Sequence, residues 1–491
     1  MKNLYKVILI LTIGILSTTG CDDYVNIDPE YTIDADNYFL APEDYDRALT
    51  GAYDLLQMSY LTLWIGEIAS DNAIAGGESF GDSQGLHEIE NMTHGGVNAE
   101  LRSVWRYMYA GVTRANFIFV NKDNIDFSGK DEILAQAAFL RAYYYFELVK
   151  FFGDVPLIVD QQLSISDVSG LERTPSSEVY AQIEEDLIYA SGILGWSANQ
   201  KGRITKGAAL ALLGKAYLYQ DKFAEAAATL DEVINDGPYS LVADYSSMFR
   251  VSNEGSSESV FEIEYVGSEG GSYDCFVCLE GFAAVGFQGI RGYQGPIYVD
   301  GNSYNLPTQD LADAFEANDP RLEASLLDIE AFVAEQTVEV TYTEGAGGHT
   351  GYYNKKYLKR EDELGQQDTD LTSPVNYRVI RYADVLLMAA EAHNRKASAD
   401  DATAIEYLNL VRSRVGMPEV MATGTDLTEA IYHERRVELS GEGLRFFDLV
   451  RTGKAASEIE GFTSNKNELF PIPQDEIDLA GAGWLQNQGY N

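Results

Sequence analysis

The stretch TKGAALALLGKAYLYQDKFAEAAATLDEVIND, residues 205–236, decides the fold of this chain. Its first half repeats apolar residues at the spacing i, i+3, i+4, i+7 and i+8, which predicts an amphipathic helix. Those residues are Ala209, Leu212, Leu213, Ala216 and Tyr217. The second half repeats the pattern from Phe223 to Ile234, and we expect Asp221 to be its N-cap. One helix pair cannot bury its own apolar face, so other pairs must stack against it.

The same pairing extends along much of the chain. Residues 213–217, followed by an Ala-rich second helix, match the core of a tetratricopeptide repeat. Apolar spacing predicts further helices, and these cover residues 42–58, 61–69, 101–121 and 131–152, with another beginning at Thr174–Pro175. Helical pairing returns at Tyr377, and Asp400 or Asp401 caps a partner helix. The fold class is therefore mainly α.

The helix expected over residues 131–152 carries the aromatic run Tyr-Tyr-Tyr-Phe at 143–146. Such a run could offer a platform for sugar rings. A helix that is apolar all round is more often a buried helix, and we favour that interpretation here.

The chain is strongly acidic, with a formal net charge of −42 over 491 residues. Nucleic-acid binding needs clustered Lys and Arg to neutralise phosphates, and no such cluster occurs. The charge also disfavours strongly anionic ligands. A soluble, self-repelling surface accounts for it without any acidic binding function.

The first 20 residues form a targeting segment. Lys2 and Lys6 precede the apolar run 7–16, which is too short to span a bilayer. Small residues then lead to Cys21, as at a lipoprotein processing site where the cysteine thiol is acylated. The alternative is a plain secretory signal in which Cys21 is incidental. The acidic segment 21–37 lacks periodicity and is expected to be an extended tether.

Two regions interrupt the helical pattern. Residues 70–98 form a long polar, Gly-rich loop, and residues 240–376 are rich in Gly, Tyr, Phe and Ser. Within the second region, residues 260–265 alternate as a strand does, and residues 338–342 with 352–358 suggest a hairpin. This predicts an irregular, partly β insertion among the helices.

Several chemical motifs have structural explanations. The charges between Glu434 and Arg451 favour an ion network, with Arg435 paired to Glu438 and Arg445 to Asp448, over acid/base catalysis. Cys275-x-x-Cys278 predicts a local disulfide or two thiols rather than a redox site. The five histidines lack metal-ligand spacing and no Gly-rich phosphate loop precedes a helix, so we expect no metal and no cofactor.

Short motifs in a fixed order resemble those of a known family. They are RAYYYF (141–146), FGDVPL (152–157), NDPR (318–321), IRYADVLL (380–387), ERR (434–436), EGLR (442–445), DLVR (448–451), LFPIP (469–473) and QNQGY (486–490). Over residues 21–491 the chain resembles a SusD/RagB-type outer-membrane nutrient-binding lipoprotein. The last motif usually carries proline where Gln488 stands.

The resemblance implies the architecture and the location. It implies four tetratricopeptide-like helix pairs, the SusD-like fold, and a division into an N-terminal region 21–240 and a C-terminal region 241–491 after the signal peptide 1–20. It implies a lipid anchor at Cys21 on the outer leaflet of the outer membrane, facing the cell exterior. It also implies a partner, a SusC-like TonB-dependent transporter.

The resemblance also places the ligand site between the loops 70–98 and 270–306. Sugar rings stack their C–H faces on aromatic rings, while their hydroxyls need polar partners. The expected ligand-binding residues are therefore Asp71, Asn72, Phe80, Tyr273, Phe276, Phe282, Phe287, Arg291, Tyr293 and Tyr298. The alternative is that most of these aromatics pack the irregular region.

The predicted function is binding of an oligo- or polysaccharide and its delivery to the transporter, without catalysis. A RagB-like peptide binder is a variant of this hypothesis. A helical glycoside hydrolase would need a carboxylate pair in a cleft, and the spacing singles out none. A non-binding repeat scaffold would tolerate alanine at the loop aromatics.

Overall fold

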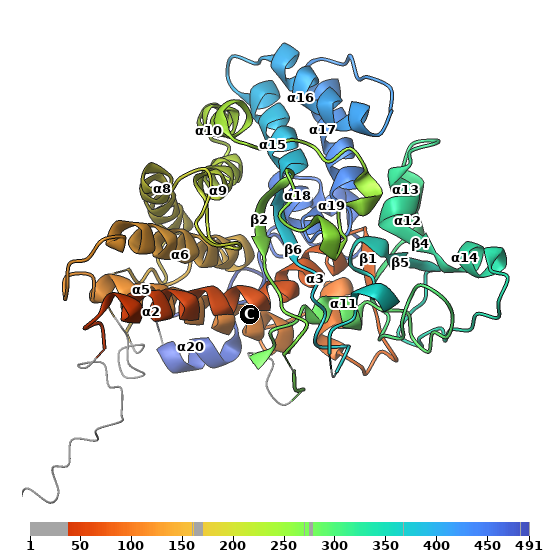
Figure 1. Ribbon diagram of the computed structural model, residues 1–491, viewed down its shortest axis with the longest axis horizontal. Helices are drawn as coiled ribbons and strands as arrows, with labels where there is room; N and C mark the ends of the chain where they lie inside the picture. The colour runs from red at the N-terminus through yellow and green to blue at the C-terminus, as the bar shows by residue number, and fades with distance from the viewer. Residues whose placement is uncertain are drawn as a thin grey trace, which may run out of the picture.

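A stack of four helix pairs forms the body of the computed structural model, which describes residues 38–159, 161, 170–269, 271–273, 278–366, 368–481 and 483–490. Each helix packs against the next, from α2 and α5 at one end to α16 at the other (Figure 1). The eight helices are α2 (Pro42–Asp54), α5 (Ala99–Val120), α6 (Lys130–Phe152), α8 (Ser176–Ile193), α9 (Lys206–Leu218), α10 (Phe223–Asp236), α15 (Tyr382–Arg395) and α16 (Asp401–Arg414). The mainly α fold with four helix pairs is confirmed.

The central pair α9 and α10 packs closely because its contact residues are small. A Cβ added at Gly214 would come within 2.5 Å of the Leu230 side chain on α10. The Thr205 side chain caps α9 by accepting a hydrogen bond from the Ala208 amide at 3.3 Å. The predicted cap of α10 is wrong: Asp221 has φ +56° in the turn, and Lys222 occupies the N-cap without a side-chain bond.

Helix α6 lies in the core, as its composition predicts. Tyr143, Tyr144 and Tyr145 are buried, and each hydroxyl donates a hydrogen bond to a neighbouring segment. Their acceptors are Ser59 Oγ at 3.0 Å, the Ala52 carbonyl at 2.6 Å and the Ile158 carbonyl at 3.0 Å. The aromatic run is therefore packing, and the sugar-platform alternative for α6 is excluded.

Short strands tie the irregular region to the helices. Among the described residues, three two-stranded antiparallel sheets form. They pair β1 (Ala73–Gly76) with β3 (Tyr304–Pro307), β2 (Ser259–Ile263) with β6 (Tyr377–Arg381), and β4 (Leu326–Asp328) with β5 (Tyr352–Asn354). The predicted strand at 260–265 is confirmed as β2.

Three local predictions are corrected by these sheets. The hairpin of 338–342 with 352–358 is wrong, because β5 pairs with β4 and Thr341 instead bridges to Gln294. Residues 377–381 are the strand β6, and the helix begins only at Tyr382. The loop 70–98 contains β1 and α4 (Gln84–Glu90). Each short strand is stabilised by a partner strand from another part of the chain, and local periodicity does not predict that pairing.

Further helices lie around the stack. They are η3 (Leu55–Ser59), α3 (Tyr60–Ile68), α11 (Ala283–Phe287), α12 (Gln309–Ala314), α13 (Arg321–Ser325), α14 (Ile329–Glu335), α17 (Gly424–Glu438), α18 (Arg445–Arg451), α19 (Ala455–Glu458) and α20 (Gln474–Ala480). In Figure 1, α3, α11 and β1 lie side by side next to the irregular region, and α3 contacts both other elements.

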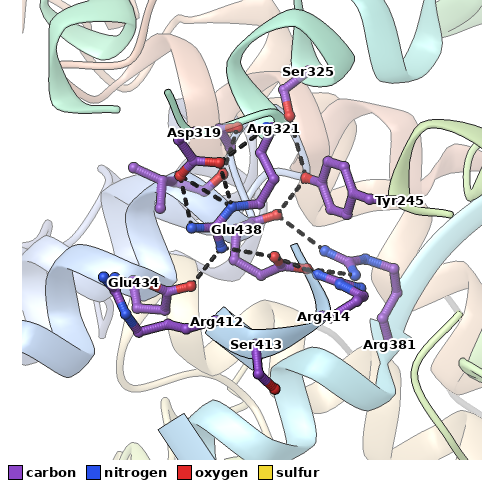
Figure 2. Close-up of polar contacts among 12 residues, drawn as sticks. Tyr245, Asp319, Arg321, Ser325, Arg381, Arg412, Ser413, Arg414, Glu434 and Glu438 are labelled. Carbon is purple, nitrogen blue, oxygen red and sulfur yellow. Dashed lines mark hydrogen bonds and ion pairs between the residues drawn. The ribbon is translucent and has the colours of Figure 1, made fainter. Parts of the chain in front are cut away.

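The charges of α17 form a buried ion network, shown in Figure 2. Glu438 accepts from Arg414 at 2.6 Å, from Arg381 at 3.0 Å and from Arg321 at 3.1 Å. Arg321 also binds Asp319 at 2.8 Å and pairs with Glu434. A structural ion network, rather than a catalytic site, explains these residues.

The individual ion pairs predicted from helical spacing are wrong. Arg435 pairs with Asp384 at 2.8 Å and Asp448 at 3.0 Å instead of Glu438. Arg445 pairs with Asp71 at 2.7 Å instead of Asp448. Spacing along one helix describes exposed faces, whereas these side chains are turned inward and meet partners from other elements.

Candidate functional site

A cleft of about 460 Å³ opens between α3, the start of α5 and the irregular region. We call it the aromatic cleft, because rings form much of its lining. The lining residues are Tyr60, Leu61, Trp64, Asp82, Ser83, Glu100, Ser103, Tyr107, Tyr273, Phe287 and Tyr304. They come from α3, the segment before α4, α5, the segment near residue 273, α11 and β3. The two regions that interrupt the helical pattern therefore meet at this cleft.

The aromatic wall of the cleft is built on α3. Tyr60 and Trp64 lie four residues apart, so they share one helical face, and their rings meet edge-on at 5.4 Å. The Trp64 ring lies 5.5 Å from Phe287 of α11 and 5.7 Å from Tyr304 of β3. Trp64 is only 6% exposed, and its buried indole N–H has no hydrogen-bond partner in the described structure.

Carboxylates supply the polar part of the lining. Glu100 accepts a hydrogen bond from Ser83 Oγ at 3.3 Å, and Asp82 accepts one from the Glu78 amide at 3.1 Å. Burial raises the pKa of Glu100. Burial, together with the neighbouring Asp82 carboxylate, also raises the pKa of Tyr304, so its hydroxyl stays protonated at neutral pH and can donate a hydrogen bond.

A strand pairing holds the two walls in register. β1 pairs with β3, which sets Gly76 opposite Tyr304. Gly77, just beyond β1, has φ +85°, and its amide donates to the Ser303 carbonyl at 2.8 Å. A Cβ at Gly77 would lie 2.7 Å from the Tyr304 ring, so only glycine fits both the conformation and the approach.

Two of the predicted ligand residues line the aromatic cleft, and two more lie on the loops that supply part of its lining. Tyr273 and Phe287 line it, and Tyr273 is 51% exposed. Phe80 is 68% exposed and packs against the His87 ring at 5.1 Å. Arg291 pairs with Glu78 at 2.9 Å, which joins the two loops.

Asp71 and Asn72 hold the loop rather than face the cleft. Asp71 accepts two hydrogen bonds from Arg445, at 2.8 and 2.7 Å, and pairs with Arg436 at 3.0 Å. Asn72 is buried and accepts from Arg436 Nε at 3.0 Å. These contacts fasten the segment before β1 to α17 and α18, and the expected ligand contacts of both residues stay a prediction.

Three of the predicted aromatics are packing residues. Phe282 is fully buried and stacks on Tyr265 at 4.7 Å. Tyr293 and Tyr298 are buried against each other in a smaller core cluster, at 6.2 Å. None of the three can stack on a sugar in this structure, because their rings are covered by protein.

The predicted lipid anchor, the Cys-x-x-Cys pair and one predicted ligand aromatic fall partly or wholly on residues that the structure does not describe. Cys21, Cys275 and Phe276 belong to segments that the structure does not describe. Cys278 is described and is disulfide-bonded, in agreement with a disulfide at the Cys-x-x-Cys motif.

Six aromatic or acidic lining residues of the cleft were not among the predicted ligand residues, and four of them lie on α3 and α5. The missed residues are Tyr60, Trp64, Asp82, Glu100, Tyr107 and Tyr304. A usable signal was present, because one of the four tryptophans of the chain stands four residues after a tyrosine and in the helix that leads into the Gly-rich loop. Trp64 falls within the helix predicted over residues 61–69, and Tyr60 lies just before it, but neither ring was predicted to contact a ligand.

Family models match the chain on both sides of its centre. Residues 24–218 match a model described as starch-binding associating with outer membrane, and residues 257–490 match the SusD family. A laminarin-binding SusD-like protein of known structure shares 35% identity, with a TM-score of 0.84, over 91% of this chain and 99% of that one. The chain therefore belongs to the SusD family, whose matched description associates it with the outer membrane.

Further relatives agree with this assignment. SusD-like protein P2 of Formosa agariphila is 28% identical over 99% of both chains. Surface glycan-binding protein A from Bacteroides thetaiotaomicron, solved in complex with laminarihexaose, is 27% identical with a TM-score of 0.80, covering 91% of this chain and 99% of that one. Among the described residues, no helix combines the length and apolarity needed to cross a bilayer.

Proposed function

We propose that this protein binds an oligosaccharide in the aromatic cleft and passes it, chemically unchanged, to a SusC-like TonB-dependent transporter. The observation that carries the binding proposal is the cleft itself. Rings from α3, α11 and β3 converge there beside two carboxylates. Its volume of about 460 Å³ falls within the usual range for small-molecule sites.

The lining suits the chemistry of a sugar. The C–H faces of a pyranose ring stack on aromatic rings such as Tyr273 and Phe287. Sugar hydroxyls donate hydrogen bonds, and the carboxylates of Asp82 and Glu100 accept them. The Tyr304 hydroxyl is a donor for sugar oxygens.

Similar proteins guide the choice of the first ligand. Two structural neighbours carry laminarin or laminarihexaose in their descriptions. Laminarihexaose is therefore the probe with which we expect binding to be detected first.

Titration calorimetry with laminarihexaose tests the site. Changing Tyr273→Ala should weaken binding at least about tenfold, equivalent to about 1.4 kcal/mol, because one stacking surface is lost. The melting temperature should stay near the wild-type value, since the ring is half exposed. Tyr189→Ala is the matched control: Tyr189 is also a partly exposed tyrosine, but it lies on α8. Equal affinities for the wild type and the Tyr273→Ala variant would contradict the site.

We also propose that acylated Cys21 anchors the mature chain to the outer face of the outer membrane, with residues 21–37 as a tether. The matched description, which associates the family with the outer membrane, supports this location. Co-purification of a TonB-dependent transporter with the affinity-tagged protein from solubilised membranes tests the partnership. A tagged protein that binds laminarihexaose but purifies alone would contradict the delivery step only.

The rival hypotheses make different predictions. A peptide binder would ignore laminarihexaose and bind peptides, with the same loss on Tyr273→Ala. A glycoside hydrolase would release reducing ends from the hexaose. A non-binding scaffold would bind neither ligand. The glycan-binding descriptions of the structural neighbours favour a glycan ligand.

A further inference from the structure

The described charged residues that line the aromatic cleft are all negative. Its described lining includes two carboxylates, Asp82 and Glu100, and neither lysine nor arginine. The nearby guanidinium of Arg291 is paired with Glu78 at 2.9 Å, so it adds little net positive charge.

We propose that Asp82 and Glu100 determine the charge class of the ligand: the cleft accepts uncharged glycans and rejects glycans bearing carboxylate or sulfate groups. This inference rests on the proposed function. It adds a specificity rule that aromatic stacking cannot supply, because a ring face stacks on neutral and acidic sugars alike.

The physical basis is the partial enclosure of the cleft. Like charges repel more strongly near a low-dielectric wall than in bulk water. A sugar carboxylate held against the aromatic wall would also lose water without gaining a cation. A neutral sugar instead offers hydroxyl donors, for which the two carboxylates are acceptors. The net charge of −42 acts in the same direction on anionic chains that approach from solution.

The negative charges of Asp82 and Glu100 can be removed while the hydrogen bonds that these side chains accept are kept. The structural role of Asp82 is to accept a hydrogen bond from the Glu78 amide, and Glu100 accepts one from Ser83 Oγ. The amide oxygens of Asn and Gln accept the same bonds. Asp82→Asn and Glu100→Gln therefore change the charge while the local hydrogen bonding can persist.

The test compares two ligands of the same length and linkage on the purified full-length protein. One is laminarihexaose, and the other is the same hexaose with its primary hydroxyls oxidised to carboxylates. The readout is the ratio of the two dissociation constants from calorimetry. The wild-type protein should favour the neutral hexaose at least about tenfold, which corresponds to about 1.4 kcal/mol. Asp82→Asn and Glu100→Gln should each lower that ratio, and the double variant should lower it most.

Two controls separate local charge from other effects. Glu419→Gln removes one charge from an exposed position between α16 and α17 and should leave the ratio unchanged. Raising the salt from about 0.05 M to about 0.5 M should lower the wild-type ratio, because it shortens the Debye length.

The outcomes distinguish this inference from the proposed function. Equal wild-type affinity for both hexaoses, or a ratio insensitive to Asp82→Asn and Glu100→Gln, overturns the charge rule while glycan binding stands. A ratio that falls equally in Glu419→Gln also overturns it, because the effect is then global. Binding of neither hexaose overturns the glycan site, and this inference with it.

Discussion

At the scale of single residues, the structure separates rings that can meet a ligand from rings that cannot. Tyr273 and Phe287 line the aromatic cleft, whereas Phe282, Tyr293 and Tyr298 are covered by protein. All five follow the same Gly-rich pattern in the sequence, which therefore predicts an aromatic region but not the direction in which each ring points. Direction is set by tertiary packing.

The buried charges show the same limit. Their role as an ion network could be predicted from their density on one segment. Their partners could not, because Glu438 meets Arg321, Arg381 and Arg414 from three other elements. A charge that is turned into the core must find partners there, whatever stands three or four residues away on its own helix.

Glu438 gives a prediction about pH. Burial by itself raises its pKa, but Arg414, Arg381 and Arg321 outweigh burial and hold the pKa well below the usual 4.5. Because the folded pKa lies below the unfolded one, the stabilisation is complete above about pH 4.5 and is lost as the pH falls toward the folded pKa. Glu438→Gln should lower the free energy of unfolding at pH 7 by about 3–5 kcal/mol.

The same variant should lose less stability on acidification than the wild type does. Denaturant unfolding at pH 7 and at about pH 3.5 measures both differences, provided that each transition is two-state. An equal loss of unfolding free energy in the two proteins would show that the ionised Glu438 carboxylate does not stabilise the fold.

At the scale of elements, the long amphipathic helices could be predicted and the short strands could not. The pair α9 and α10 is specified by its own apolar spacing and small residues. β1, by contrast, has four residues and is stabilised by β3, more than two hundred residues later. Long-range packing also explains why Tyr60 and Trp64 were not predicted as lining residues. They line the cleft only because β3 and α11 pack against α3.

Leu213→Asp tests the register of α9. Leu213 is buried between helices, so an aspartate there places a charge in an apolar contact. The free energy of unfolding should fall by at least about 3 kcal/mol. Leu410→Asp on α16, where the leucine is partly exposed, is the control and should change stability by only about 0.5 kcal/mol. Similar melting temperatures for the two variants would show that the α9 face is wrongly assigned.

At the scale of the whole molecule, one main core joins the helical stack to the irregular region. Its buried residues run from Phe39 to Trp484, so they come from both sides of position 240. The division into regions 21–240 and 241–491 stays a prediction about sequence organisation. The continuous core gives the aromatic cleft rigid walls, because α3 and α11 both pack into it.

The anchor is a whole-molecule property, and Cys21→Ala tests it. Without acyl chains the protein loses its membrane affinity and should become soluble or mis-sorted. Antibody labelling of intact cells and fractionation measure this. Ser17→Ala, which keeps the cysteine, should label as the wild type does. Undiminished, membrane-attached labelling of the Cys21→Ala protein would contradict the anchor.

The most direct test of the central claim is a crystal structure of the protein with laminarihexaose. The account predicts sugar density in the aromatic cleft, with a ring stacked on Tyr273 or Phe287 and a hydroxyl bonded to Asp82 or Glu100. Sugar bound anywhere else on the molecule, with the aromatic cleft empty, would contradict it.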